Sequence, residues 1–150
     1  MQKNNKIRIV PLTKELVPQV AAIEAACFSE PWSESAYMEA CEKEDYLYIV
    51  ATDEAGRAIG MCGLIIGPFE AEVMNVAVHP DYRGQGIAGC LMDALLEVGE
   101  AHGVKEFTLE VRVGNAPAIH VYESHGFAEE GIRPRFYRKP EEDALIMWRR

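Results

Sequence analysis

The residues that point most directly to chemistry form a short glycine-containing loop, residues 83–89, which reads RGQGIAG. An apolar segment ends at Pro80, just before this loop, and an amphipathic helix is expected to begin directly after it. Glycines at the start of a helix leave several backbone N–H groups unpaired, close to the positive end of the helix dipole. This arrangement suits a phosphate or pyrophosphate group.

Two familiar nucleotide-binding loops fit this stretch less well. A P-loop requires the pattern GxxxxGK[ST], and the lysine of that pattern is missing here. Residues 84–89 do satisfy the dinucleotide fingerprint GxGxxG, and an acidic residue follows at Glu106 or Glu110. However, residues 79–83 separate the glycines from their strand, and the remaining chain is too short for a doubly wound sheet. A nicotinamide-dinucleotide site is thus kept only as the alternative interpretation of this loop.

Hydrophobic periodicity and turn residues predict the elements that must position this loop. Strands are expected at residues 7–10, 46–52, 58–66, 72–78, 106–112, 127–133 and 144–148. Helices are expected after a Thr13 cap, after a Ser33 cap, from residue 87 to Gly103, and over residues 115–125. The strand–helix order in the central part places one parallel strand pair beside antiparallel neighbours. The sequence thus predicts an α/β protein with a mixed sheet, as a single domain over residues 1–150.

The composition excludes several classes of function. Apolar residues make up 49% and charged residues 26% of the chain, as in ordinary soluble proteins. The formal net charge of −9 argues against nucleic acid as a ligand and is compatible with a basic protein partner. No apolar run is long enough to span a membrane, and the N-terminus does not resemble a signal peptide, so we expect a cytoplasmic protein. The four cysteines lack metal-ligand spacing, and we expect reduced thiols and no metal.

Motifs along the chain resemble those of the GNAT acetyltransferases. Residues 83–88, RGQGIA, match the R/Q-x-x-G-x-G/A loop that holds the pyrophosphate of acetyl-CoA in that family. Residues 115–118, NAPA, and 121–127, VYESHGF, are similar to its N-x-x-A and Y-x-x-x-G-F segment. Three further stretches resemble the subgroup of RimI-type ribosomal-protein-alanine N-acetyltransferases: PWSE at 31–34, LEVR at 109–112 and EDALIM at 142–147.

The resemblance implies a GNAT fold of about seven strands and four helices, in which the central parallel strands splay apart. It also implies direct transfer of an acetyl group from acetyl-CoA to the N-terminal alanine of a small-subunit ribosomal protein. An α-amine, with a pKa of about 7.7–8.0, loses its proton more easily than a lysine at about 10.4, which weakly favours that acceptor. A lysine side chain, a polyamine or another small amine remains open as acceptor, as does a non-catalytic acyl-CoA sensor.

By this resemblance Glu110 is the catalytic base and Tyr122 is the acid that protonates the coenzyme thiolate. From strand alternation alone, Glu110 is a solvent-facing residue, and Tyr122 alone is a core-edge aromatic residue. The resemblance assigns acetyl-CoA binding to Val76, Ala77, Val78, Arg83, Gly84, Gln85, Gly86, Ile87, Ala88, Gly89 and Asn115. Trp32 and Tyr137 are candidate walls of the acceptor site.

Four positions leave questions open. Asn75 interrupts an apolar strand, and it marks either a bulge that opens a groove or an outward-facing residue. Ala88 stands where the subgroup commonly has glycine. Pro134 and Phe136 lie in a segment, RPRFY, that usually ends in two tyrosines, which bears on acceptor recognition.

Overall fold

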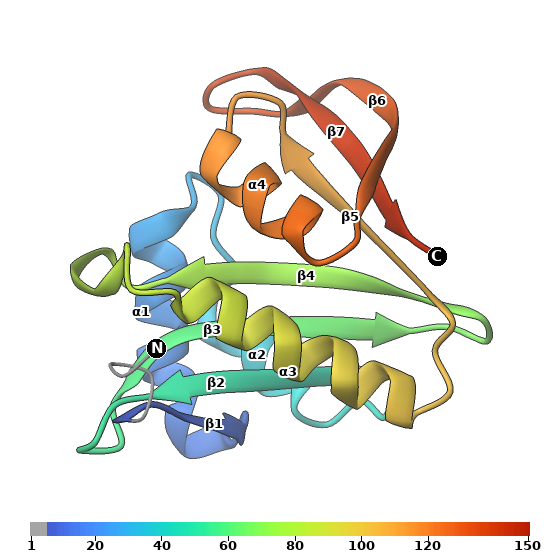
Figure 1. The fold of residues 1–150 in the computed structure, drawn as a ribbon. Helices are drawn as coiled ribbons and strands as arrows, with labels where there is room; N and C mark the ends of the chain where they lie inside the picture. Colours follow the sequence, from blue (N-terminus) through green and yellow to red (C-terminus); the bar gives the residue numbers. More distant parts are fainter. Residues whose placement is uncertain (1–5) are drawn as a thin grey trace.

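The computed structural model describes residues 6–150, in which a seven-stranded mixed sheet lies between two layers of helices (Figure 1). The strands are β1 (Arg8–Pro11), β2 (Tyr46–Thr52), β3 (Ala58–Ile66), β4 (Glu70–Val78), β5 (Glu106–Arg112), β6 (Ala128–Tyr137) and β7 (Glu142–Arg149). The α-helices are α1 (Val17–Cys27), α2 (Glu34–Ala40), α3 (Ile87–Ala101) and α4 (Ala116–Ser124). Two short 3-10 helices, η2 (Lys14–Leu16) and η3 (Pro80–Tyr82), complete the described elements.

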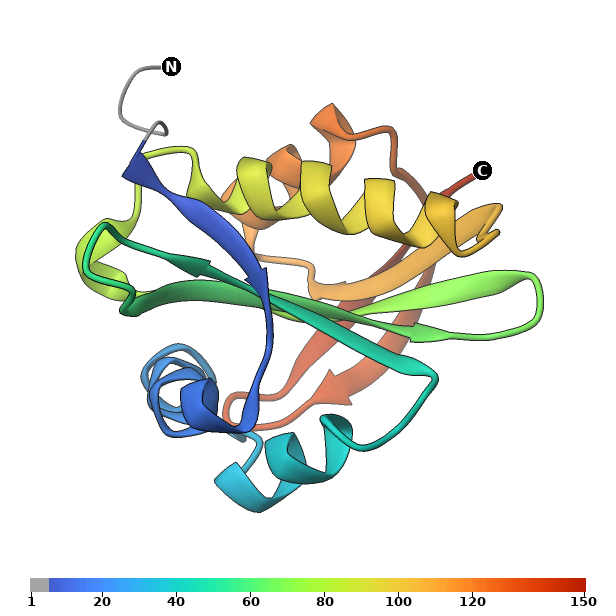
Figure 2. The same ribbon diagram turned by 90° about the horizontal axis from the view of Figure 1, so that it is seen from below.

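The sheet has the strand order β1-β2-β3-β4-β5-β7-β6, and its neighbours are antiparallel except for β4 and β5. Helices α3 and α4 cover one face of the sheet, and α1 and α2 cover the other (Figure 2). The predicted mixed sheet with one central parallel pair is therefore confirmed. No helix among the described residues is long and apolar enough to cross a membrane.

Each face of the sheet carries its own apolar core. Under α3, the side chains of Leu91 and Leu95 pack with Leu64 and Phe107, all of them fully buried. On the opposite face, Val17 and Val20 of α1 pack with a second set that includes Tyr37, Val50 and Met61. Burial on both faces explains why β2 and β3 read as almost continuous apolar runs in the sequence.

Side-chain caps set two of the helix starts, and the cap at Ser33 is the one that the sequence predicts. The Ser33 hydroxyl accepts a hydrogen bond from the Ala36 N–H (3.1 Å), and the Asn115 side chain accepts one from the Ala118 N–H (3.3 Å). The predicted Thr13 cap is wrong, because the Thr13 side chain makes no capping bond. Its backbone carbonyl instead accepts from Leu16 N (3.0 Å), which closes the 3-10 turn before α1.

Strands β4 and β5 part after a short contact. Among the described residues they pair at Glu70 with Glu106, Ala71 with Phe107, and Glu72 with Thr108, and no further. Beyond Glu72, β4 contains a bulge, at which Asn75 has a φ of 55° and the register with β3 shifts. The bulge interpretation of Asn75 is thus confirmed, and the outward-facing alternative is wrong. The parting leaves one edge of β4 open toward a gap between the strands.

We predict that Gly99 is required for the packing of α3 on the sheet. A Cβ atom at this position would lie 2.6 Å from the Phe107 ring and 3.1 Å from Leu64 Cδ1. Overpacking of this kind costs about 1–3 kcal/mol, so Gly99→Ala is expected to lower the free energy of unfolding in urea by that amount.

Gly89→Ala is the matched control on the same helix, because its Cβ would meet nothing closer than His125 Cε1 at 3.8 Å. Alanine is favoured over glycine in a helix by about 0.8–1 kcal/mol, so this variant is expected to be neutral or more stable. Equal losses in the two variants would contradict the packing argument.

Candidate active site

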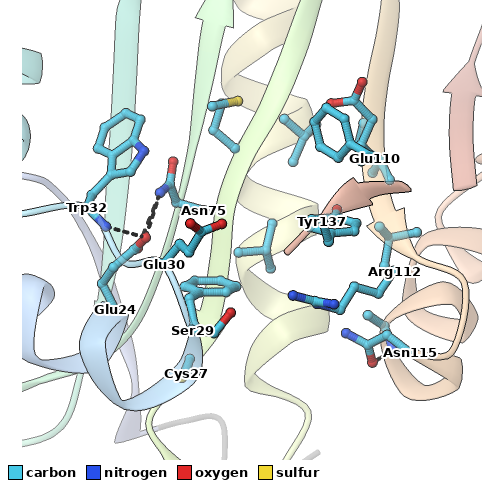
Figure 3. A pocket seen from close by; sticks show the side chains of 18 of the residues that line it. Glu24, Cys27, Ser29, Glu30, Trp32, Asn75, Glu110, Arg112, Asn115 and Tyr137 are labelled. Atoms are coloured by element: carbon cyan, nitrogen blue, oxygen red, sulfur yellow. Dashed lines mark hydrogen bonds between the residues drawn. The ribbon is translucent and has the colours of Figure 1, made fainter. Parts of the chain in front are cut away.

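A pocket of about 590 Å³ opens where β4 and β5 part. Its walls come from β4, β5, α4, the segment between α1 and α2, and the end of β6. Figure 3 shows Glu24, Trp32 and Asn75 on one side, with Glu110, Arg112, Asn115 and Tyr137 on the other. Six residues predicted from the sequence line this pocket together: Trp32, Val76, Glu110, Asn115, Tyr122 and Tyr137. The other predicted residues, Ala77, Val78 and 83–89, follow along β4 and the loop beyond it.

The glycine loop has the backbone geometry of an anion site. Gly84 and Gly86 both have a φ of 78°, in the left-handed region that favours glycine. A Cβ at Gly84 would meet no atom within 4 Å, so backbone conformation and not space requires glycine there. Helix α3 begins at Ile87, and no described side chain caps it at Gly86. The first N–H groups of α3 are therefore available to an anion.

Arg83 connects this loop to the pocket wall. Its Nε donates to the Val78 carbonyl oxygen (3.3 Å), and its Nη2 donates to Cys27 Sγ (3.2 Å). The Cys27 thiol also donates to the Val78 carbonyl (3.4 Å). The end of β4, the end of α1 and the start of the loop are thus held together by one arginine, whose remaining donors stay exposed at the mouth of the loop.

Glu110 points into the pocket and away from solvent. Its side chain is 19% exposed, and Glu110 Oε2 forms an ion pair with Arg133 Nε at 2.8 Å. The solvent-facing position expected from alternation is wrong, although Phe107, Leu109 and Val111 do fill the core on the other side as the pattern predicts. The reason is that β6 departs from its register with β7 between Arg133 and Tyr137, and this segment covers Glu110.

Tyr122 is buried in the pocket wall formed by α4, where its ring packs 6.0 Å from that of Phe127. Burial raises the pKa of its hydroxyl, so the phenol is protonated at neutral pH. A protonated phenol in contact with the pocket is a hydrogen-bond and proton donor. The core-edge position and the donor role are therefore compatible at this residue.

A buried carboxylate, missed by the sequence analysis, holds one wall in place. Glu24 on α1 is 2% exposed and accepts from Tyr37 Oη (2.6 Å) and from the Trp32 backbone N–H (3.0 Å). The Asn75 Nδ2 donates to both of its oxygens at 3.2 Å (Figure 3). The sequence does contain a sign of this burial, because Glu24 lies one helical turn after Val20, on the apolar face of a predicted helix.

This network extends through Asn75 to β2. The Tyr48 hydroxyl donates to Asn75 Oδ1 at 2.7 Å, and a Cβ at Gly63 would overlap the Tyr48 ring. Burial, followed by the Glu24 charge, raises the pKa of both Tyr37 and Tyr48. Trp32 stacks near these two rings, with centroid distances of 5.1 and 5.8 Å. The β4 bulge and the segment before α2 are therefore fixed to each other.

The opposite wall is organised by Arg112. Its guanidinium donates to Glu142 Oε1 (3.1 Å) and to the carbonyls of Pro140 (2.9 Å) and Arg138 (3.0 Å). It also lies over the Tyr137 ring, 4.5 Å from its centroid. Burial and the nearby Glu110 charge raise the pKa of Tyr137 to about 12. Arg112 therefore positions Tyr137 against the pocket, a role that the LEVR motif alone did not indicate.

Neither metal nor thiolate chemistry is supported by the described residues. Residues 6–150 contain no group of three His, Cys, Asp or Glu side chains that could hold a metal ion. All four cysteines are free. Burial raises the pKa of the Cys90 thiol, which opposes the thiolate that a nucleophile at this helix start would need.

The chain belongs to the acetyltransferase (GNAT) family, whose profile matches residues 17–127. It is therefore an acetyltransferase with the fold that its motifs predicted. The [ribosomal protein bS18]-alanine N-acetyltransferase of Escherichia coli K12 is 37% identical over 133 residues, which cover 87% of this chain and 88% of that protein.

Two solved structures show the same fold over nearly the whole chain. The crystal structure of the ribosomal-protein-S18-alanine N-acetyltransferase from Escherichia coli has a TM-score of 0.87 at 35% identity, covering 95% of this chain and 92% of that chain. A chain in the NatC complex bound to Gag peptide and CoA also has a TM-score of 0.87, at 25% identity, with 96% and 98% covered.

We predict that the Tyr37 hydroxyl stabilises the protein through Glu24. Tyr37→Phe removes the shortest hydrogen bond to a buried carboxylate, which is expected to cost about 1–3 kcal/mol in urea unfolding. The control is Tyr46→Phe, where the half-buried ring faces the Lys43 ammonium at 4.7 Å, and a change below about 0.5 kcal/mol is expected. Equal stability of the two variants would refute the role of the Tyr37 bond.

Proposed function

We propose that this chain transfers the acetyl group of acetyl-CoA to the N-terminal α-amine of a protein, with the N-terminal alanine of a ribosomal protein as the acceptor. The observation that carries the proposal is the parting of β4 and β5, which brings Glu110 and Tyr122 to one pocket. The relatives named as bS18-alanine N-acetyltransferases support the choice of acceptor. We propose further that residues 1–150 form one domain and that the reaction takes place in the cytoplasm, where ribosomal proteins are made.

The described residues fit acetyl-CoA along a continuous path. The first N–H groups of α3 and the donors of Arg83 suit its pyrophosphate, with Gly84, Gln85, Gly86, Ile87, Ala88 and Gly89 forming the loop. Beyond Glu72 the edge of β4 does not pair with β5, so an extended pantetheine arm can run along Val76, Ala77 and Val78, as an added strand would. Asn115, which caps α4, and Tyr122 on that helix both line the pocket. In the proposal, the acetyl carbon then lies in the pocket.

In the proposed reaction, Glu110 takes a proton from the acceptor ammonium, either directly or through one water. The amine nitrogen then forms a bond to the acetyl carbon, and the carbon–sulfur bond breaks. The Tyr122 hydroxyl donates a proton to the departing thiolate, and its buried position keeps that proton available at neutral pH. The nitrogen bonded to the acetyl carbon releases its second proton through water to the Tyr122 phenolate, which leaves the amide, the thiol of the coenzyme and a neutral tyrosine. Backbone groups of β4 hold the thioester carbonyl, where negative charge develops during the transfer.

The pocket also suits a basic acceptor. Carboxylates of Glu24, Glu30, Glu72 and Glu110 line it, while aromatic side chains of Trp32, Phe28, Phe136 and Tyr137 form its rim and walls. The formal net charge of −9 attracts a positively charged protein and speeds its encounter. Apolar and aromatic walls contact the first side chains of an extended peptide, and the carboxylates contact its terminal ammonium.

Acceptor choice is tested with three peptides incubated with acetyl-CoA and read by mass spectrometry: one that begins with alanine, one that begins with serine, and one with a blocked N-terminus and an internal lysine. We expect a mass gain of one acetyl group at the α-amine of the alanine-first peptide. This acetylation should be at least about tenfold faster than that of the other peptides, because a small change in the group that enters a pocket is worth about 1–3 kcal/mol. Preferential acetylation of the lysine, or of spermidine added as a fourth acceptor, would redirect the proposal to another amine.

The roles of Glu110 and Tyr122 are tested with Glu110→Gln and Tyr122→Phe. Each is expected to lower kcat by about 10²-fold or more, because a positioned general acid or base contributes about 10²–10⁴. Calorimetric affinity for acetyl-CoA is expected to stay within about twofold, since neither change touches the loop or the β4 edge. Glu106→Gln, on β5 but outside the pocket, is the matched control and should retain wild-type turnover. Wild-type turnover in either test variant would remove that residue from the mechanism.

A further inference from the structure

A second carboxylate, Glu72, lies beside the proposed base and was not singled out from the sequence. Glu72 is the last residue of β4 that pairs with β5, opposite Thr108. Glu110 is two residues beyond Thr108, so its side chain is on the same face of β5 as that of Thr108. Both glutamates line the pocket, at the point where the strands part.

The two carboxyl groups lie close enough in the pocket for each to influence the ionisation of the other. Burial raises the pKa of Glu72 and the negative charge of Glu110 raises it further, while the Arg133 guanidinium lowers it. Two carboxylates that share one site cannot both ionise freely, so the pair has a higher affinity for one proton than an isolated glutamate.

The positive charges around Glu72 and Glu110 do not fully balance the negative charges of these two carboxylates. The titratable and charged groups that face Glu72 around the pocket are Glu24, Glu30, Tyr48, Glu110, Arg133 and Tyr137. Arg133 forms an ion pair with Glu110 Oε2, but its side chain is 59% exposed, so water screens much of its charge. Arg112 is already engaged by Glu142. The pair therefore suits one additional positive charge, and the terminal ammonium of an acceptor supplies it.

We propose that Glu72 is a positioning residue that shares with Glu110 the proton taken from the acceptor amine, an inference that rests on the proposed function. An N–H bond of the ammonium breaks, and an O–H bond forms on Glu110. The proton is then held between Glu110 and Glu72, and the pair changes from two negative charges to one while the ammonium becomes a neutral amine. After the product leaves, the proton passes to solvent. Glu72, whose pKa is raised by burial and by the Glu110 charge, thus offers the proton a second site beside the proposed base. A lone glutamate, with a pKa of about 4.3, lies far below an amine.

Proton sharing is tested first without any acceptor. Carboxyl ¹³C resonances are followed by NMR from pH 3 to 9 in the wild-type protein, with the Glu72 signal identified by its loss in Glu72→Gln. We expect Glu72 to titrate above the usual range in the wild type and to titrate lower in Glu110→Gln, where the neighbouring charge is gone. An unchanged Glu72 titration in Glu110→Gln overturns the inference, whatever the acceptor of the enzyme proves to be.

The kinetic test measures kcat/KM for the alanine-first peptide against pH. Glu72→Gln is expected to move the acidic limb of the profile to lower pH by about one unit and to lower the plateau by about tenfold, because the pair loses the carboxyl group whose pKa is raised. The matched control is Glu70→Gln, which makes the same charge change two residues earlier on β4, at an exposed position, and should follow the wild-type profile.

The outcomes of the kinetic test are distinct. A Glu72→Gln limb that coincides with the wild-type limb overturns the inference, since a purely structural role would lower the plateau and leave the limb in place. An equal shift of the limb in Glu70→Gln also overturns it, because general electrostatics would then be the cause. If the wild-type protein acetylates no alanine-first peptide, the proposed acceptor is wrong, and the NMR titration alone decides whether the two carboxyl groups share a proton.

Discussion

The structure depends on the separation of two parallel strands that neighbour each other in the sheet. Strands β4 and β5 pair at three positions, and then β4 turns away at the Asn75 bulge while β5 continues beside β7. Backbone groups along a parted edge must find partners in water or in a ligand, because unpaired buried groups are costly. The gap is therefore a place where the fold can accept an extended molecule, and it lies next to the free N–H groups of α3.

The two sides of the gap are built differently. On the side of β4, the buried Glu24 carboxylate accepts hydrogen bonds from Trp32, Tyr37 and Asn75, and this full satisfaction is what makes a buried charge tolerable. On the side of β5, Glu110 pairs with the largely exposed Arg133, and the exposed Phe136 also lines the pocket. The first wall is held by a buried polar network, and the second by surface contacts around Arg112, so the second has more freedom to adjust to an acceptor.

Electrostatics in the gap follow from this construction. Glutamates from α1, β4 and β5 line one pocket. Of the arginines near them, Arg112 pairs with Glu142, and Arg133 is largely exposed to solvent. Such a pocket favours a cationic guest, and within it burial and the Glu110 charge raise the pKa of Glu72. Both properties suit an acetyltransferase, which must bind an ammonium group and then remove its proton.

Local features could be predicted from the sequence alone. Strands β2, β3 and β5 have the predicted bounds, and the Ser33 cap and the uncapped start of α3 follow from residue types and short spacings. At Asn75 the sequence left a bulge and an outward-facing residue open, and the structure shows the bulge. These features depend on neighbours within a few residues. The orientation of Glu110 toward a covered pocket, the burial of Glu24 and the meeting of Glu72 with Glu110 were decided by tertiary structure. Each depends on segments far apart in the chain, since burial and proton affinity are set by what packs against a side chain and not by its position in a periodic pattern.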